Sequence, residues 1–128
     1  MKETNQVKLN VYEIKTFPFG ISLYHTSIEY DDVEYSFGIS NNKSGVYEMS
    51  PKCSNIGKYV ASINLGRKTR REFFTKFEKI RTLYNKKQYN FLTLNCNHFT
   101  NDYLKSVFGI EIPQKYQSFL KLGEFFRM

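Results

Sequence analysis

The spacing of the apolar residues changes near Thr69, and this change limits the chain to a small set of folds. Before Thr69, apolar and polar residues alternate, as at Val7, Leu9 and Val11, which is the period of a half-buried strand. After Thr69, apolar residues recur at every third or fourth position, which is the period of a helix. Strands followed by helices indicate the α+β class. We therefore expect a small antiparallel sheet or barrel packed against helices.

Extended segments account for most of the first half of the chain. After the first strand, residues 15–20 (KTFPFG) are expected to form a loop. The β-favouring residues of 21–39 then predict an antiparallel hairpin with its turn at Asp31-Asp32. Two more short extended segments are expected, around Val46-Tyr47 and over residues 59–65. The N-terminal half is therefore predicted to be mostly β.

Two helices are predicted from a capping signal and from the placement of a proline. Thr69 and Glu72 form a capping-box pattern that predicts a helix over residues 69–85, whose core face would be Phe73, Phe77, Ile80 and Tyr84. Pro113 suits the first turn of a further helix near the C-terminus. Three apolar residues of that helix would cover the core or the edge of a groove: Phe119, Leu122 and Phe126.

Between these two helices, the sequence predicts a helix that begins at a cysteine. Asn95 suits the N-cap, Gly109 suits the end, and three apolar residues lie four positions apart: Phe99, Tyr103 and Val107. Cys96 would then be the first helical residue, where unpaired N–H groups and the helix dipole stabilise a thiolate. The backbone N–H of Cys96 or Asn97 would also stabilise an oxyanion. Cys96 is therefore the candidate nucleophile.

A cysteine nucleophile also needs a base, and the chain contains two histidines, His25 and His98. Residues i and i+2 of a helix point to nearly opposite sides, so His98 would turn away from Cys96. His25, on the predicted second strand, is the better candidate base. From the residues alone, the alternative is a buried structural Cys96 and a hydrogen-bonded core His25.

The length of 128 residues, 41% of them hydrophobic, suits one domain over residues 1–128 with its own core. The first twenty residues carry polar groups throughout, and no later apolar run is long enough to span a bilayer. We therefore expect no signal peptide, no integral membrane association, and a location in the cytoplasm, the nucleus or both. Cys53 and Cys96 are expected to be reduced thiols, with Cys53 in a structural position.

Two other uses of the charged and metal-ligating residues are less favoured. Zinc sites draw on paired ligands such as C-x-x-C, and the cysteines and histidines of this chain lack such spacing, so we expect no metal. Residues 67–87 are rich in Lys and Arg, and the net charge of +7 would suit an acidic partner. The aromatic residues of this segment are spaced like a core face, so we expect a solvated helix surface and no nucleic-acid site.

Four stretches of the sequence, taken in order, resemble the PPPDE/DeSI family. They are VKLNVYE, GISLYHTSIEY with VEYSFGI, SINLGRKT and LNCNHFTNDYLKSVFGIEIP. The resemblance covers residues 7–113 and is most specific at residues 24–27 (YHTS) and 95–99 (NCNHF).

The resemblance implies a papain-like fold in circularly permuted order, with the histidine ahead of the cysteine and the nucleophile at a helix N-terminus. It implies a catalytic dyad of Cys96 and His25, with Asn95 as a candidate oxyanion donor. The implied activity is hydrolysis of isopeptide or thioester links to ubiquitin- or SUMO-like modifiers. The partners would then be the modifier and its conjugates, and no cofactor is needed.

Two alternatives to an isopeptidase are considered. Residues 95–99 also resemble the Asn-Cys-Glu-His-Phe motif of lecithin:retinol acyltransferase-like enzymes, with Asn97 in place of the glutamate. The first alternative is therefore an acyltransferase or lipid thioesterase similar to the lecithin:retinol acyltransferase and NlpC/P60 families. Members of the lecithin:retinol acyltransferase-like family carry a second histidine about a dozen residues after the first, and here that region holds none. The other alternative is a basic module that binds an acidic protein without catalysis, with Cys96 unused.

Overall fold

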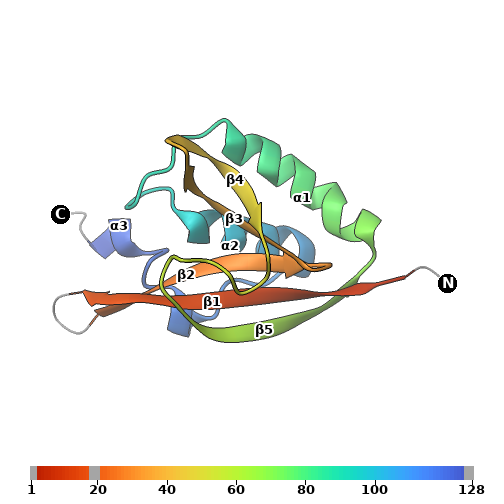
Figure 1. Ribbon diagram of the computed structural model, residues 1–128, viewed down its shortest axis with the longest axis horizontal. Coiled ribbons are helices and arrows are strands. Elements are labelled where there is room, and N and C mark those ends of the chain that lie inside the picture. Colours follow the sequence, from red (N-terminus) through yellow and green to blue (C-terminus); the bar gives the residue numbers. More distant parts are fainter. Residues whose placement is uncertain (1–2, 18–20, 126–128) are drawn as a thin grey trace.

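The computed structural model describes residues 3–17 and 21–125, with strands in the first half and helices in the second (Figure 1). The strands are β1 (Asn5–Phe17), β2 (Ile21–Tyr30), β3 (Val33–Ser40), β4 (Lys43–Met49) and β5 (Lys58–Lys68). The helices are α1 (Arg70–Asn85), α2 (Cys96–Phe108) and α3 (Leu122–Phe125). The predicted α+β class, with an antiparallel sheet packed against helices, is confirmed.

The five strands form one antiparallel sheet in the order β4-β3-β2-β1-β5. The β2–β3 and β3–β4 hairpins have two-residue turns in which both residues have positive φ, 50° and 63° at Asp31 and Asp32 and 52° and 64° at Asn41 and Asn42. Asp and Asn tolerate this left-handed region, and two such residues match the twist of the flanking strands. The predicted hairpin and its turn are confirmed over residues 28–35, where β2 and β3 pair.

Strand β1 is longer than predicted. Its ladder with β2 continues to Phe17, which pairs with Ile21, so the predicted loop is wrong for residues 15–17. Residues 18–20 lie outside the described part of the chain. β1 is bonded to β2 on one side and to β5 on the other, and this long-range pairing outweighs the local signal for a loop.

The helix-facing side of the sheet is apolar and packs on α1 and α2. The ring of Phe73 in α1 stacks on Tyr30 of β2, with centroids 4.2 Å apart and planes 6° apart, and on Phe77 at 5.1 Å. The predicted core face of α1 is confirmed, because all four of its residues are buried, as is the predicted capping box. Burial of each such aromatic side chain contributes roughly 1.5–3 kcal/mol.

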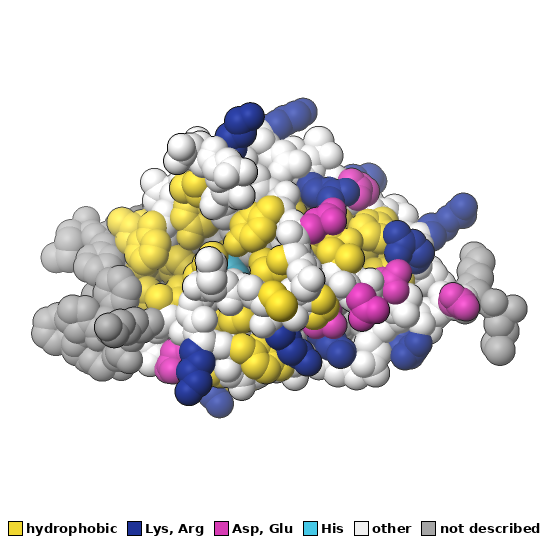
Figure 2. All heavy atoms as spheres, viewed as in Figure 1, with side chains coloured by type: hydrophobic (Ala, Val, Ile, Leu, Met, Phe, Trp, Pro, Cys, Tyr) yellow, Lys and Arg dark blue, Asp and Glu magenta, His cyan; other side chains and the backbone are white. Residues whose placement is uncertain are grey.

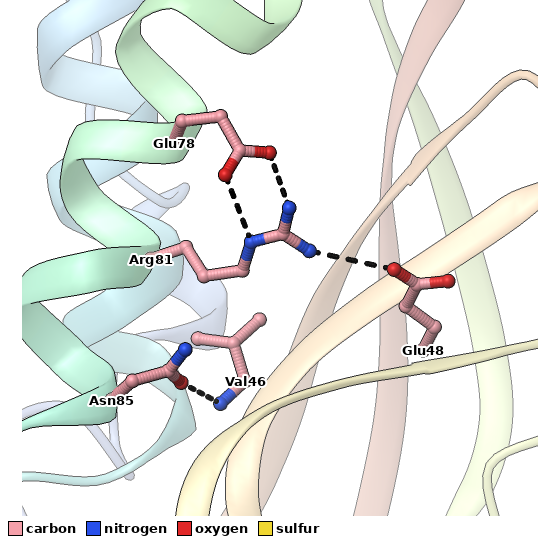
Figure 3. Close-up of polar contacts among 5 residues, drawn as sticks. All are labelled: Val46, Glu48, Glu78, Arg81 and Asn85. Atoms are coloured by element: carbon pink, nitrogen blue, oxygen red, sulfur yellow. Dashed lines mark hydrogen bonds and ion pairs between the residues drawn. The ribbon is translucent and has the colours of Figure 1, made fainter.

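Polar contacts tie the edge strand β4 to α1 (Figure 3). The guanidinium of Arg81 lies between the carboxylate of Glu78 on the same helix and that of Glu48 on β4, which is 3.4 Å away. Near the end of α1, Asn85 accepts the Val46 N–H through its Oδ1 at 2.8 Å. An edge strand carries backbone groups without a strand partner, and these contacts cover part of that edge.

The basic segment over residues 67–87 lies mainly on the surface, as predicted. Arg71, Lys76 and Lys79 are exposed, and the exposed Arg70 pairs with Asp31 at 2.8 Å. Figure 2 shows Lys and Arg interspersed with Asp and Glu on the side of the molecule where α1 begins. These cations do not form one continuous basic patch on that face.

The C-terminal segment differs from the single helix predicted to begin with Pro113. Pro113 precedes a 3₁₀ turn, Gln114–Tyr116, and α3 follows as a separate helix of four residues. The reason is that the polar groups between them bond to other elements. Ser118, for example, donates to the carbonyl of Ser22 on β2. Among the described residues, no helix has the length and apolar character needed to cross a bilayer.

Substitution of Phe73 by alanine should lower the free energy of unfolding by about 3–5 kcal/mol, because it removes a ring stacked between two others. Leu83→Ala is the matched control, since Leu83 is on the same helix but 57% exposed. It should change stability by less than about 0.5 kcal/mol. Urea denaturation followed by circular dichroism measures both. Equal effects would contradict the placement of Phe73 in the core.

Candidate active site

The N-terminus of α2 positions Cys96. Asn95 is the N-cap, and its Oδ1 accepts the N–H of Asn97 at 3.0 Å, while its own N–H donates to Nδ1 of His98 at 2.9 Å. The helix ends at Gly109, whose φ of 66° lies in the left-handed region that glycine adopts without strain. The predicted start and end of this helix are confirmed, and Cys96 is its first residue.

Cys96 meets His25 where α2 packs against β2. The Nδ1 atom of His25 lies 2.9 Å from Sγ of Cys96, and both residues are 1% exposed. The ring of His98 turns back toward Asn95 and caps the helix. The structure therefore brings together the two predicted site residues. Their catalytic roles remain predictions.

Asn97 bonds α2 to the part of β2 that does not pair with β3. Among the described residues, the ladder between β2 and β3 covers residues 28–30 of β2, and the part of β2 before them faces α2. There, Oδ1 of Asn97 accepts the N–H of Thr26 at 3.1 Å, and its Nδ2 donates to the carbonyl of Tyr24 at 2.8 Å. One side-chain amide thus pairs with β2 as a neighbouring strand would. His25, between the two bonded residues, is held beside α2.

Two further side chains contact the imidazole of His25. Ser36 of β3 places its Oγ 3.3 Å from Nε2. The ring of Tyr12 of β1 lies alongside, with centroids 5.5 Å apart and planes inclined at 47°, because Tyr12 is directly opposite His25 in the β1–β2 register. The imidazole is therefore contacted at both ring nitrogens and by an aromatic ring.

The sheet face that carries His25 also holds a buried polar layer centred on Glu34. The Glu34 carboxylate is fully buried and is bonded to Ser27. It also accepts hydrogen bonds from three groups, at 2.7, 2.7 and 2.8 Å: Asn10 Nδ2, the Tyr12 hydroxyl and the Lys52 backbone N–H. In the described part of the chain, no buried side-chain nitrogen or oxygen lacks a partner. A buried carboxylate is tolerated on this condition.

Neither Ser36 nor Glu34 is predicted from the sequence as part of the site. Both alternate with the apolar residues of β3, a pattern that predicts a solvent-exposed face of the sheet. In the structure, the β4–β5 loop covers this face, so both residues are buried. One signal was present in the sequence. A two-residue turn at Asp31-Asp32 sets a register in which Ser36 falls opposite Ser27, on the same face as His25.

Burial keeps the Cys96–His25 pair neutral. Desolvation raises the pKa of the Cys96 thiol well above its ordinary value. The backbone N–H groups of Thr26, Asn97 and Cys96 itself lower this pKa, but by less than desolvation raises it. Desolvation likewise lowers the pKa of His25 to about 4, against a raising effect of the Glu34 charge. Release of the thiol proton to water is therefore unfavourable. Burial also disfavours the imidazolium, so the resting pair is a neutral thiol beside a neutral imidazole.

The side-chain amide of Asn95, the candidate oxyanion donor, is already engaged. Its Nδ2 donates to the carbonyl of Phe91 at 3.1 Å and to that of Phe119 at 2.9 Å. A side-chain amide has two N–H hydrogens, so none is left for an oxyanion in this arrangement. Asn95 therefore caps α2 and anchors the C-terminal segment.

The C-terminal segment covers Cys96. Phe119 and Leu122 are buried and pack together with Leu23 of β2 around the thiol. Their prediction as covering residues is confirmed, and Phe126 lies outside the described residues. The thiol therefore lies beneath a small apolar cluster.

Cys53 is an exposed free thiol, so the prediction that it has a structural position is wrong. It lies in the β4–β5 loop, where its N–H bonds to the carbonyl of Ser50 and the preceding Lys52 has a φ of 61°. This tight turn covers the polar layer with backbone groups and leaves the thiol outside. Neither Cys53 nor Cys96 forms a disulfide in the structure, and their reduced state remains a prediction.

A thiol at a helix N-terminus, paired with an imidazole on a neighbouring strand, is the arrangement of cysteine-dependent hydrolases. The comparison with protein families agrees. The chain belongs to the PPPDE family, because the family model described as "PPPDE putative peptidase domain" matches residues 5–127. The predicted family membership is confirmed, and the circularly permuted order remains a prediction.

Two curated proteins illustrate the relationship. The chain is 32% identical to a DeSI-like protein of Arabidopsis thaliana, over 93% of the chain and 57% of that protein. It is 31% identical to a desumoylating isopeptidase 1 homologue of Caenorhabditis elegans, over 84% of the chain and 36% of that protein. The chain therefore spans little more than half the length of the first relative and about a third of the second.

The neutral state of His25 predicts that stability falls in acid. The pKa of His25 is about 4 in the folded protein and ordinarily 6.5, so between these values the unfolded chain binds the additional proton. The stability is therefore present above pH 6.5 and is lost as the pH falls toward 4. The loss amounts to at most about 3 kcal/mol. Urea denaturation between about pH 7 and about pH 4.5 measures it.

His25→Gln is the control for this prediction, because glutamine stays neutral over the same range. Burial also lowers the pKa of His98, so wild type and variant share that contribution and their difference reports His25. Identical pH slopes in the two proteins would show that His25 is not held neutral by the fold.

Proposed function

We propose that this chain is a cysteine isopeptidase that releases ubiquitin- or SUMO-like modifiers from their conjugates, with Cys96 as nucleophile and His25 as base. The observation that carries the proposal is the 2.9 Å contact between Sγ and Nδ1 at the start of α2. Membership of a family described as a peptidase supports it. So does the name of the C. elegans relative, a desumoylating isopeptidase homologue.

In the first half of the reaction, Sγ of Cys96 attacks the carbonyl carbon of the isopeptide bond while its proton passes to Nδ1 of His25. The backbone N–H of Cys96, beside its own sulfur, donates to the oxyanion in place of the Asn95 side chain. As the C–N bond breaks, His25 returns the proton to the leaving lysine nitrogen. The modifier is then held on Sγ as a thioester.

In the second half, Nδ1 of His25 takes a proton from water as the water oxygen bonds to the thioester carbonyl carbon. The C–S bond breaks, the proton returns to Sγ, and the modifier leaves with a free C-terminal carboxyl group. A thioester substrate follows the same course with a thiol as the leaving group. His25 on a strand ahead of Cys96 on a helix is also the order expected of a permuted papain-like fold.

The depth of the thiol favours a slender substrate. Both Cys96 and His25 are 1% exposed, and the apolar cluster around Phe119 and Leu122 narrows the approach. A scissile carbonyl must therefore arrive on an extended segment, such as the C-terminal tail of a ubiquitin- or SUMO-like modifier. We place the activity in the cytoplasm, the nucleus or both, where such conjugates are formed.

Electrophilic probes test this proposal. In a Cys53→Ser background, which removes the exposed thiol, we expect a ubiquitin or SUMO probe to label the protein covalently. Cys96→Ser should abolish the labelling, because the nucleophile is lost. His25→Ala should slow it by about 10²- to 10⁴-fold, because the base is lost. Intact-mass spectrometry measures the labelled fraction over time.

The probe that reacts separates the alternatives. Labelling by acyl-thioester probes without labelling by either modifier would replace the isopeptidase with an acyltransferase or lipid thioesterase. Absence of labelling by every probe would leave the non-catalytic binding module. Labelling that persists in Cys96→Ser would refute the assigned nucleophile.

A further inference from the structure

We propose that Ser36 is the positioning residue for His25, because its hydroxyl accepts the Nε2 hydrogen and so presents the Nδ1 lone pair to Cys96. The inference deepens the proposed function, on which it rests for the role of His25 as base. It starts from the 3.3 Å distance between Ser36 Oγ and His25 Nε2. With the 2.9 Å contact at Nδ1, both ring nitrogens have an assigned neighbour.

The position of one hydrogen decides whether His25 can act as a base toward Cys96. A neutral imidazole carries its hydrogen either on Nδ1 or on Nε2, and the partner of one nitrogen sets the state of the other. A hydrogen on Nδ1 would leave no lone pair to take the thiol proton. The hydrogen must therefore reside on Nε2, where Ser36 is the neighbouring polar group.

The hydroxyl of Ser36 has a second polar neighbour besides His25. Ser36 lies opposite Tyr47 in the β3–β4 ladder. Burial raises the pKa of the Tyr47 phenol, and the side-chain hydrogen bond with Ser36 acts in the opposite direction. A hydroxyl carries one hydrogen and two lone pairs, so Ser36 can donate to the Tyr47 phenol and still offer a lone pair to Nε2 of His25.

The surroundings hold this arrangement in place. A Cβ atom at Gly38 would lie 3.0 Å from Cε1 of Tyr47, so the absence of a side chain at Gly38 lets the Tyr47 ring pack against β3. Glu34, two residues before Ser36 on β3, accepts the hydroxyl of Tyr12 at 2.7 Å, and the Tyr12 ring lies alongside the imidazole. Ser36 itself is fully buried, so bulk water does not compete for Nε2.

Three variants separate positioning from folding. Ser36→Ala removes the acceptor, and Ser36→Thr retains a hydroxyl at the same place. Ser40→Ala is the matched control, since Ser40 lies at the exposed end of the same strand. Nitrogen-15 spectra of histidine-labelled protein at neutral pH show which ring nitrogen carries the hydrogen. We expect hydrogen on Nε2 in the wild type, Ser36→Thr and Ser40→Ala, and a loss of this preference in Ser36→Ala.

The reactivity of the thiol is the second readout. In the Cys53→Ser background, Ser36→Ala should slow alkylation of Cys96 by iodoacetamide by about 10- to 100-fold, as when the hydrogen-bond partner of a metal-bound histidine is removed. Ser36→Thr should restore the rate. With a modifier conjugate as substrate, Ser36→Ala should lower kcat and leave KM unchanged, because Ser36 contacts the base and not the substrate.

The role of Ser36 can be tested separately from the proposed isopeptidase activity, because the nitrogen-15 spectra and the alkylation of Cys96 need no substrate. Hydrogen on Nδ1 in the wild type would overturn the proposal even if Ser36→Ala did not fold. A wild-type tautomer and alkylation rate in folded Ser36→Ala would also overturn it. The expected spectra and rates without turnover of any conjugate would support the role of Ser36 and refute the isopeptidase.

Discussion

The pairing of the Asn97 side chain with the backbone of β2 is the contact on which the rest of the site depends. Backbone N–H and C=O groups at the edge of a sheet require partners. Among the described residues, β2 has no strand on one side before residue 28, where its pairing with β3 ends. Asn97 satisfies two of these groups with one amide. His25 is the residue between the two bonded positions, and Cys96 is the residue before Asn97. The thiol and the imidazole are therefore close together because Asn97, at the start of α2, bonds to the backbone of β2 on both sides of His25.

The second constraint is the polar layer behind the imidazole. A face that carries His25, Ser36 and Glu34 would ordinarily be solvated, and here the β4–β5 loop closes over it. Burial disfavours charge on both the thiol and the imidazole, and it also protects the hydrogen bonds that orient the ring. The site thus combines a neutral resting pair with a fixed imidazole. A fixed proton acceptor suits transfer within the pair, because little reorganisation is needed when the thiol reacts.

Much of the fold could be predicted from local signals. The turn at Asp31-Asp32, the capping box of α1 and the start of α2 at Cys96 each depend on residues close together in sequence, and the structure has all three. The predictions that failed depend on distant partners. β1 extends through residues 15–17 because β2 pairs with it, and the segment after Pro113 breaks into a 3₁₀ turn and α3, with Ser118 between them bonded to β2.

The α+β class, the helix that Cys96 opens and the choice of His25 over His98 as its neighbour follow from the amino-acid sequence, because they depend on periodicity, capping and the directions of side chains on a helix. Tertiary contacts were needed to show that Ser36 and Glu34 lie beside the site, that the Asn95 amide is engaged, and that Cys53 is exposed. Alternation along a strand marks two faces but does not show what covers each one. Which loop closes over a face depends on contacts between residues far apart in the chain.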